Sequence, residues 1–208
     1  MSITIDDLKS LADLAVKNPP VDDVRLEDFS RNPGYETFSD ENPSWWPYYE
    51  FLRLLARAMV PERITDLGTE LGRSCFYMAT GSPNSMVTTV ECGGRPPDTY
   101  LRFLGQCANV HIVMGMDTAE WGLTRLSRGD YFSELVFIDT SHTHRQTLLE
   151  WGIYRNLMRF GGVAVFDDVD TDGVRGAWNE IGLPKIELPE LHKGNGFGAV
   201  LVPRIGEK

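Results

Sequence analysis

The chain has 208 residues, of which 42% are hydrophobic, and this is enough material for one globular core. Its 20 basic and 30 acidic residues give a formal net charge of -10, with no run of Lys or Arg. This balance disfavours nucleic acid and membrane surfaces as partners and favours small substrates or protein partners. Three cysteines without a C-x-x-C pair, no long apolar span and no leader after Met1 predict a cytoplasmic chain with reduced thiols.

The first part of the chain predicts a helix and an arm. Residues 3–17 have apolar side chains at helical spacing, with Asp6 and Asp7 near the start. This pattern indicates an amphipathic helix that packs on the core or on a second subunit. Residues 18–47 are rich in Pro, Asn, Asp and Ser, and are expected to form an arm able to close over a pocket. We therefore divide the chain into an N-terminal helix and arm, 1–44, and a main domain, 45–208.

The main domain begins with an aromatic cluster, residues 45–51, which leads into a helix that ends at Pro61. The rings are expected mainly to pack in the core or at an interface. The alternative is that some of them form the wall of a ligand site.

The stretch from Ile64 to Ser74 predicts a strand, a tight turn and a helix. Asp66 comes near the end of the strand, and Gly68 and Gly72 lie four residues apart in the turn. Because glycine lacks a Cβ, the backbone can bend there and approach a ligand closely. The spacing is not that of a dinucleotide fold or a P-loop. It suits a phosphate-free ligand with an amine and a carboxylate, such as S-adenosylmethionine, although a purely structural corner is an alternative.

Two further strands are predicted next, over 86–90 and 110–114, with a helix over 100–107 between them. The first strand ends on Glu91, which is placed to accept hydrogen bonds from both hydroxyls of a ribose, unless it is only a solvated acid. Met116 and Asp117 follow the second, where they could contact an adenine ring and its amine.

The second half continues the alternation of strands and helices. A strand over 134–138 leads to Asp139, a helix is expected over 145–160, and Gly161 and Gly162 are expected to end it. A strand over 163–166 then ends at Asp167 and Asp168. A helix over 173–181 and strands over 185–188 and 198–202 follow, the last two as an antiparallel edge. This alternation predicts an α/β fold with a parallel sheet. The expected buried residues of the 145–160 helix are Leu148, Leu149, Tyr154, Leu157 and Met158.

Acidic residues stand at the carboxyl ends of these strands, where open α/β sheets bind ligands. Among them, Asp139, Asp167 and Asp168 are candidates to hold Mg²⁺, which prefers carboxylate oxygens. His142 is the candidate general base, because the ordinary imidazole pKa lies near neutrality. Helix capping by the two consecutive aspartates and a structural hydrogen bond by His142 are the alternatives. His144 and His192 receive no role.

Three segments together resemble the class I S-adenosylmethionine-dependent methyltransferases. They are 64–74, the block Val136-Phe137-Ile138-Asp139-Thr140-Ser141-His142, and the Gly-Gly-x-x-x-x-Asp-Asp run over 161–168. Within that family the resemblance is to the group of macrocin O-methyltransferase and the cephalosporin methoxylation protein, over about residues 45–202. The resemblance implies a Rossmann-like, seven-stranded, mostly parallel sheet with an antiparallel C-terminal edge and helices on both faces.

The resemblance also implies the division of roles. S-adenosylmethionine would lie along Gly68, Glu91 and Asp117, the metal at Asp139, Asp167 and Asp168, and His142 would be the base, with Asp139 as its catalytic partner. The full set expected to bind the cofactor is Asp66, Gly68, Thr69, Gly72, Ser74, Glu91, Met116 and Asp117.

The leading hypothesis is therefore a Mg²⁺-dependent O-methyltransferase that acts on a hydroxyl of a small molecule, a sugar or a secondary metabolite. A metal-independent methyltransferase and a catalytically silent subunit that binds S-adenosylmethionine are the alternatives. A dinucleotide oxidoreductase fits Glu91 equally well, but no Tyr has a Lys four residues later. The N-terminal helix and arm make a homo-oligomer plausible.

Overall fold

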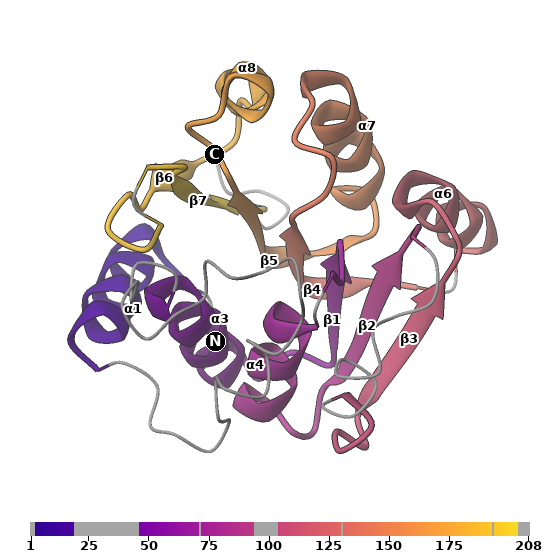
Figure 1. Cartoon of the computed structure of the whole chain (residues 1–208), viewed down its shortest axis with the longest axis horizontal. Coiled ribbons are helices and arrows are strands. Elements are labelled where there is room, and N and C mark those ends of the chain that lie inside the picture. The colour runs from indigo at the N-terminus through magenta and orange to yellow at the C-terminus, as the bar shows by residue number, and fades with distance from the viewer. Residues whose placement is uncertain are drawn as a thin grey trace, which may run out of the picture.

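The structure is a computed structural model that describes residues 3–18, 46–70, 72–93, 104–129, 131–192 and 194–203. The strands of the described residues form one seven-stranded sheet in the order β3-β2-β1-β4-β5-β7-β6 (Figure 1). They are β1 Arg63–Leu67, β2 Met86–Glu91, β3 Val110–Met114, β4 Ser133–Ile138, β5 Met158–Asp167, β6 Lys185–Glu187 and β7 Phe197–Leu201. Strands β3, β2, β1, β4 and β5 pair in parallel, and β7 is antiparallel to both β5 and β6. This confirms the predicted fold class, including the antiparallel edge.

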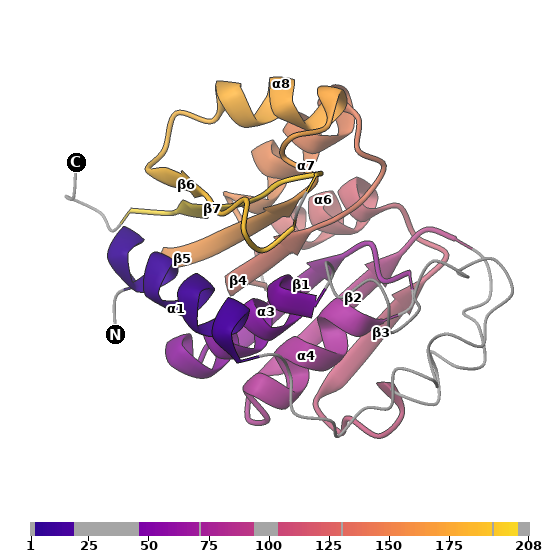
Figure 2. The ribbon, with the colours of Figure 1, turned by 60° about the vertical axis from the view of Figure 1, so that its left-hand side comes forward.

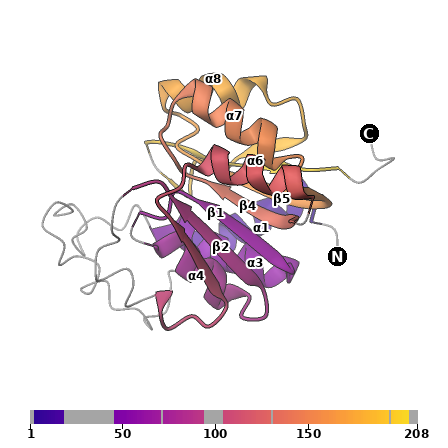
Figure 3. The same ribbon diagram turned by 90° about the vertical axis from the view of Figure 1, so that its right-hand side faces the viewer.

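Helices cover both faces of the sheet. The helices are α1 Ile5–Lys17, α3 Trp46–Met59, α4 Arg73–Gly81, α6 Thr118–Arg128, α7 His144–Tyr154 and α8 Asp172–Glu180. In Figures 2 and 3, α1, α3 and α4 lie on one side of the strands, and α6, α7 and α8 lie on the other. The arrangement is that of a doubly covered parallel sheet.

Two hydrophobic clusters fill the spaces between the sheet and these two layers. In β4, Leu135 and Phe137 belong to the cluster under α1, α3 and α4, whereas Val136 and Ile138 belong to the cluster under α6, α7 and α8. The side chains alternate because successive Cβ atoms of a strand point to opposite faces. A strand buried on both faces therefore reads as a continuous apolar run in the sequence.

The N-terminal helix forms where the sequence predicts it and packs on the core. Thr4 and Asp7 cap its first turn reciprocally, side chain to backbone in both directions. Leu8, Ala12 and Ala15 are buried in the same cluster as the apolar side of α3. The boundary drawn between 44 and 45 stays a prediction, because residues 19–45 lie outside the described residues, as do residues 100–103 of the helix expected over 100–107.

The helix expected over 145–160 is wrong in its second half. Helix α7 ends at Tyr154, and β5 already begins at Met158 and runs through both glycines. Ser133 pairs with Met158 but Leu135 pairs with Val163, so β5 carries extra residues at Gly161, whose φ is 84°. The glycines therefore accommodate an irregularity inside a strand and do not end a helix.

The residues expected to be buried in this segment are confirmed in part, since Tyr154, Leu157 and Met158 are buried. Leu149 is 45% exposed, whereas the polar residues Thr147 and Glu150 are buried beside Trp151. Apolar spacing could not reveal this face, because a carboxylate and a hydroxyl occupy part of it. The sequence analysis also missed α6, which begins directly after Asp117. No helix among the described residues is long and apolar enough to span a membrane.

Candidate functional site

The turn after β1 lies against the loop that follows β4. Gly68 has a φ of 89°, and a Cβ built on it would lie 1.7 Å from the carbonyl oxygen of Asp139. Gly72 also has a positive φ, 74°, and begins α4. Only glycine fits at position 68, since any side chain there would push the Asp139 loop away. The glycine turn thus sets the distance between two parts of the predicted site.

Asp66 is enclosed by the elements around that turn. Its two carboxylate oxygens accept hydrogen bonds from Ser74 Oγ at 2.8 Å and from Thr89 Oγ1 at 2.6 Å. Thr69 Oγ1 lies 2.5 Å from the same Thr89 hydroxyl. Burial raises the pKa of Asp66 to about 7, although the two hydroxyl donors oppose the shift. Asp66 therefore connects β1, β2 and α4, and it does not line either of the cavities described below.

A cavity of about 460 Å³ opens at the carboxyl ends of β1, β2 and β4. This volume is in the range of pockets that hold small ligands and cofactors. Five of the predicted residues line it: Gly68, Glu91, Asp117, Asp139 and His142. Its other lining residues are Glu70, Val90, Cys92, Thr118, Thr140, Ser141 and Gln146.

A smaller hollow continues from the cavity along the glycine turn. It shares Gly68 and Asp139 with the cavity and adds Thr69 and Ser74 from the predicted set, together with the buried Arg73. Gly72 and Met116 line neither space; Met116 packs instead against the cluster under α6, α7 and α8. Most of the predicted cofactor-binding residues therefore line one of two adjoining spaces, whereas Asp66 is buried behind them.

Glu91 and Asp117 are both held by backbone amides. Glu91 accepts from the amides of Glu70 at 3.0 Å and Gly93 at 2.7 Å. Asp117 Oδ1 accepts from the amides of Ala119 and Glu120 and so caps α6. Both carboxylates remain at the cavity wall, and the amides fix their orientation.

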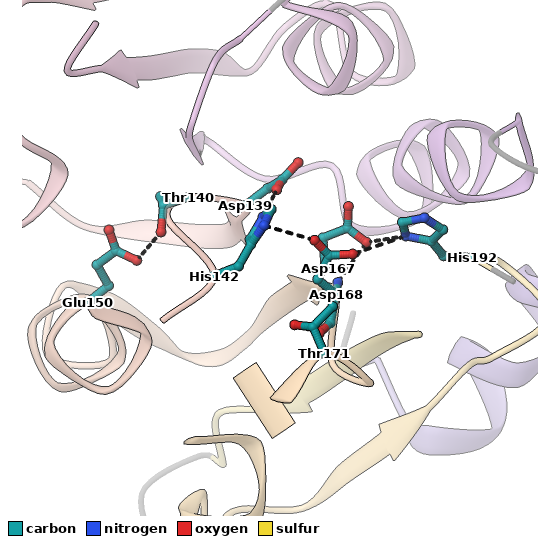
Figure 4. A network of polar contacts seen from close by, with 8 residues as sticks. All are labelled: Asp139, Thr140, His142, Glu150, Asp167, Asp168, Thr171 and His192. Carbon is teal, nitrogen blue, oxygen red and sulfur yellow. Dashed lines mark hydrogen bonds and ion pairs between the residues drawn. The ribbon is translucent and has the colours of Figure 1, made fainter. Parts of the chain in front are cut away.

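The loops after β4 and β5 bring the predicted metal and base residues together (Figure 4). His142 Nε2 lies 2.9 Å from Asp139 Oδ1, and His142 Nδ1 lies 3.0 Å from Asp168 Oδ2. The imidazole therefore stands between the two carboxylates. Its hydrogen bond to Asp139 raises the pKa of His142, with partial burial opposing the shift. Burial likewise raises the pKa of Asp139, and the charges of Asp167 and Asp168 add to this effect.

His192 is a member of this cluster that the sequence analysis missed. Its Nδ1 lies 2.6 Å from Asp167 Oδ1, and the side chain is 2% exposed. A topological signal could have found it, because β7 is antiparallel to β5 and Asp167 pairs with Phe197 at the start of β7. The loop before β7 must therefore lie at the edge of the sheet where β5 ends.

Glu150 is a second residue that sequence reasoning missed. It is fully buried on α7 and accepts hydrogen bonds from Thr118, from Thr140 at 2.8 Å and from Gln146 at 2.8 Å. These three donors line the cavity, and burial raises the pKa of Glu150. The carboxylate thus connects the loops that follow β3 and β4.

The donor set at the ends of β4 and β5 fits a divalent cation. Two groups of three residues can each hold a metal ion: Asp139, His142 and Asp168 form one, and Asp167, Asp168 and His192 form the other. Within each group, one ligand atom from every residue lies within 4.8 Å of the others. Asp168 Oδ1 is buried and, among the described residues, has no hydrogen-bond partner. A buried carboxylate oxygen in that state is costly unless a cation or a donor satisfies it.

Comparison with known proteins gives a consistent result. No family model matches the chain. It is 32% identical over 130 residues to a catechol O-methyltransferase of Mycobacterium tuberculosis, a match that covers 60% of this chain and 56% of that protein. The chain thus matches about half the length of this relative.

Solved structures resemble the chain over nearly its whole length. The O-methyltransferase TomG from Streptomyces achromogenes, involved in tomaymycin synthesis and solved with S-adenosylmethionine, has a TM-score of 0.67 at 21% identity, over 94% of this chain and 96% of that one. An O-methyltransferase from Bacillus cereus, solved with S-adenosylhomocysteine, has a TM-score of 0.59 at 19% identity, over 96% and 92%. These likenesses confirm the predicted fold. The resemblance to the macrocin group in particular stays a prediction.

Proposed function

We propose that this chain, which has the fold of the class I S-adenosylmethionine-dependent methyltransferases, is an O-methyltransferase that acts on a hydroxyl of a small molecule. The cavity at the carboxyl ends of the strands carries the proposal, because it joins Glu91 and the glycine turn to Asp139 and His142 in one space. The local identity to a catechol O-methyltransferase supports the same activity. Catechols, sugars and phenolic secondary metabolites are the acceptors to test first.

The cofactor would lie along the cavity wall formed by β1 and β2. Glu91 would accept the hydrogen bonds of the ribose hydroxyls, with its carboxylate oriented by the amides of Glu70 and Gly93. Asp117 stands at the same wall, at the start of α6, where the adenine would bind. The methionine part would follow the turn at Gly68 toward Ser74, so that the sulfonium methyl faces the Asp139 loop.

The reaction would take place beside Asp139 and His142. Asp139, Asp167 and Asp168 would hold a divalent cation, for which Mg²⁺ is the expectation; such an ion lowers the pKa of a bound acceptor hydroxyl. An imidazole nitrogen of His142 takes the hydroxyl proton, the oxygen attacks the methyl carbon, and the carbon–sulfur bond breaks to leave S-adenosylhomocysteine. Proximity and alignment of the two substrates supply much of the acceleration.

The electrostatics of the cluster favour the cation-dependent form of this proposal. Asp139 and Asp168 raise the pKa of His142, so the imidazole between them tends to keep its proton. It can take the hydroxyl proton only after it has lost that proton, a loss that a cation bound to these carboxylates would favour by balancing their negative charge.

The experiment combines binding and turnover. We expect the protein to bind S-adenosylhomocysteine in calorimetry, and Glu91→Gln to weaken this binding about tenfold or more, because two charge-assisted hydrogen bonds become neutral ones. Glu120→Gln, an exposed acid on α6, is the matched control and should bind as the wild type does.

Turnover is then measured as methyl transfer to a panel of catechols and sugars. Asp139→Asn should retain S-adenosylhomocysteine binding and lose transfer, and EDTA should stop transfer by the wild type. Full activity in EDTA would contradict the role of the metal. Tight cofactor binding without transfer to any acceptor would favour a silent binding subunit.

A further inference from the structure

His192 is a buried histidine that packs against the predicted metal site from the side opposite His142 (Figure 4). Its Nδ1 lies 2.6 Å from Asp167 Oδ1 and 4.0 Å from Asp168 Oδ1. One ligand atom from each of Asp167, Asp168 and His192 lies within 4.8 Å of the other two, the span of groups that can hold a metal ion. Two of the three carboxylates of the predicted site, Asp167 and Asp168, therefore have the His192 nitrogen donor within the same group.

Asp168 links this group to the rest of the site. One of its carboxylate oxygens, Oδ2, meets His142, and the other, Oδ1, faces His192. Oδ1 is buried and has no hydrogen-bond partner among the described residues, and Asp168 as a whole is 5% exposed. A buried carboxylate oxygen is costly unless a cation or a hydrogen-bond donor satisfies it, so the His192 side of this carboxylate is suited to a cation.

The two histidines have opposite surroundings. The His142 side chain is 42% exposed, at the mouth of the cavity, and its residue has a φ of 51°. The His192 side chain is 2% exposed, and its ring stacks on Tyr48 of α3 with centroids 5.4 Å apart. Tyr48 is itself buried and packs on Phe197. His192 is thus held in one orientation, as a structural ligand requires, whereas His142 faces the space where substrates would bind.

We propose that His192 is a direct ligand of the cation, together with the carboxylates of Asp167 and Asp168, and that the site therefore prefers a first-row transition ion such as Mn²⁺ to Mg²⁺. The inference rests on the proposed function only in placing a cation at this edge of the sheet. Mg²⁺ is bound almost entirely through oxygen, whereas imidazole nitrogen favours the transition ions, and Mn²⁺ accepts both. The nitrogen that now contacts Asp167 is the one that would coordinate.

The first test is a comparison of two metals by calorimetry. Metal-free protein is titrated with MnCl₂ and separately with MgCl₂, and the ratio of the two dissociation constants is compared between wild type and His192→Asn. The Asn amide can still donate to Asp167 in place of Nδ1, but it offers no imidazole nitrogen. We expect the preference for Mn²⁺ to fall about tenfold or more in this variant, mainly through weaker Mn²⁺ binding. An unchanged ratio would overturn the proposal, since it would mean that His192 only donates a hydrogen bond to Asp167.

The control is a histidine outside the cluster. His144 contacts Glu180 on α8, and His144→Asn should leave both dissociation constants as they are in the wild type. Thermal unfolding of each metal-free variant shows whether it is folded before titration.

A spectroscopic measurement does not depend on the stability of His192→Asn. Mn²⁺ bound to His142→Asn protein should show a ¹⁴N coupling from a directly bonded imidazole in electron spin echo spectra, because His192 remains. The absence of this coupling would contradict direct ligation. Binding of S-adenosylhomocysteine to the metal-free protein reports separately on the proposed function, so the failure of one proposal can be told from the failure of the other.

Discussion

Asp66 and Glu91 are similar in the sequence, since each stands near the carboxyl end of a strand, but the structure gives them different surroundings. Asp66 is fully buried and bonded to two hydroxyl groups, whereas Glu91 reaches the cavity. A carboxylate enclosed by neutral donors costs more in its charged form than one at a cavity wall. The pH dependence of stability should therefore report on Asp66.

We expect the wild type to lose stability as the pH rises toward 7. Burial raises the pKa of Asp66 in the folded protein from 3.8 to about 7. The protonated carboxyl therefore contributes fully to the free energy of unfolding below the pKa of the unfolded state, and this contribution is lost as the pH rises through the pKa of the folded state. One pKa unit corresponds to about 1.4 kcal/mol, so the loss should exceed about 1 kcal/mol.

Asp66→Asn removes this titration. The decrease in the free energy of unfolding between pH 4 and 8 should be smaller in Asp66→Asn than in the wild type, as measured by urea unfolding at several pH values. It should not vanish, because burial also raises the pKa of Glu150. Asp13→Asn, on the exposed side of α1, serves as the control. If the free energy of unfolding decreased equally between pH 4 and 8 in all three proteins, Asp66 would not titrate in this range.

At the scale of the elements, the turns after the central strands adopt uncommon backbone conformations. Gly68 follows β1 with a φ of 89°, His142 follows β4 with a φ of 51°, and Asp168 follows β5 with a φ of 57°. Residues other than glycine adopt such angles at a cost of about 1–3 kcal/mol, and they cluster at functional sites. The site is thus built from tight turns at one edge of the sheet.

Replacement of Gly68 by Ala tests the close contact between two of these turns. The new Cβ would lie 1.7 Å from the Asp139 carbonyl oxygen, so either the turn or the Asp139 loop must move. We expect Gly68→Ala to lose at least about 3 kcal/mol of stability and to lose S-adenosylhomocysteine binding.

Gly129→Ala is the matched control for this substitution. Gly129 also has a positive φ, 63°, but a Cβ there would meet no atom within 4 Å. Its cost should be about 1 kcal/mol, from the left-handed backbone alone. Similar losses in the two variants would contradict the steric explanation. Both values come from urea unfolding.

At the scale of the whole molecule, the sheet separates two hydrophobic clusters. The cluster under α1, α3 and α4 includes α1, which precedes the glycine turn by some 50 residues in the chain. The site lies at the carboxyl edge of the sheet and has no contact with α1 among its lining residues. Stability and cofactor binding should therefore respond separately to changes in α1.

Leu8→Ala should destabilise the protein without changing cofactor affinity. Leu8 is completely buried between α1 and the core, so we expect a loss of about 2–5 kcal/mol in urea unfolding. Leu14→Ala, on the same helix but 44% exposed, should cost less than about 0.5 kcal/mol. If Leu8→Ala proved as stable as Leu14→Ala, α1 would not be part of the folded core in solution.

Much of the fold could be predicted because buried parallel strands carry a local signal. Val136, Phe137 and Ile138 form an apolar run that ends in Asp139, and the run before Asp167 has the same form. Helix α7 and strand β5 were harder to predict. The buried side of α7 contains Thr147 and Glu150, and β5 passes through two glycines that usually interrupt regular structure.

The sequence by itself determined the succession of the strands along the chain and the acids at their carboxyl ends, because these depend on neighbours along the chain. The need for glycine at position 68 follows from a tertiary contact, the close approach of the Asp139 carbonyl oxygen. Only the tertiary structure decided that Asp66 is enclosed, that Glu150 connects the loops and that His192 meets Asp167. His192 and Asp167 are 25 residues apart and become neighbours only because β7 returns antiparallel beside β5. Contacts of this kind depend on the pairing of distant strands, which no local pattern of residues records.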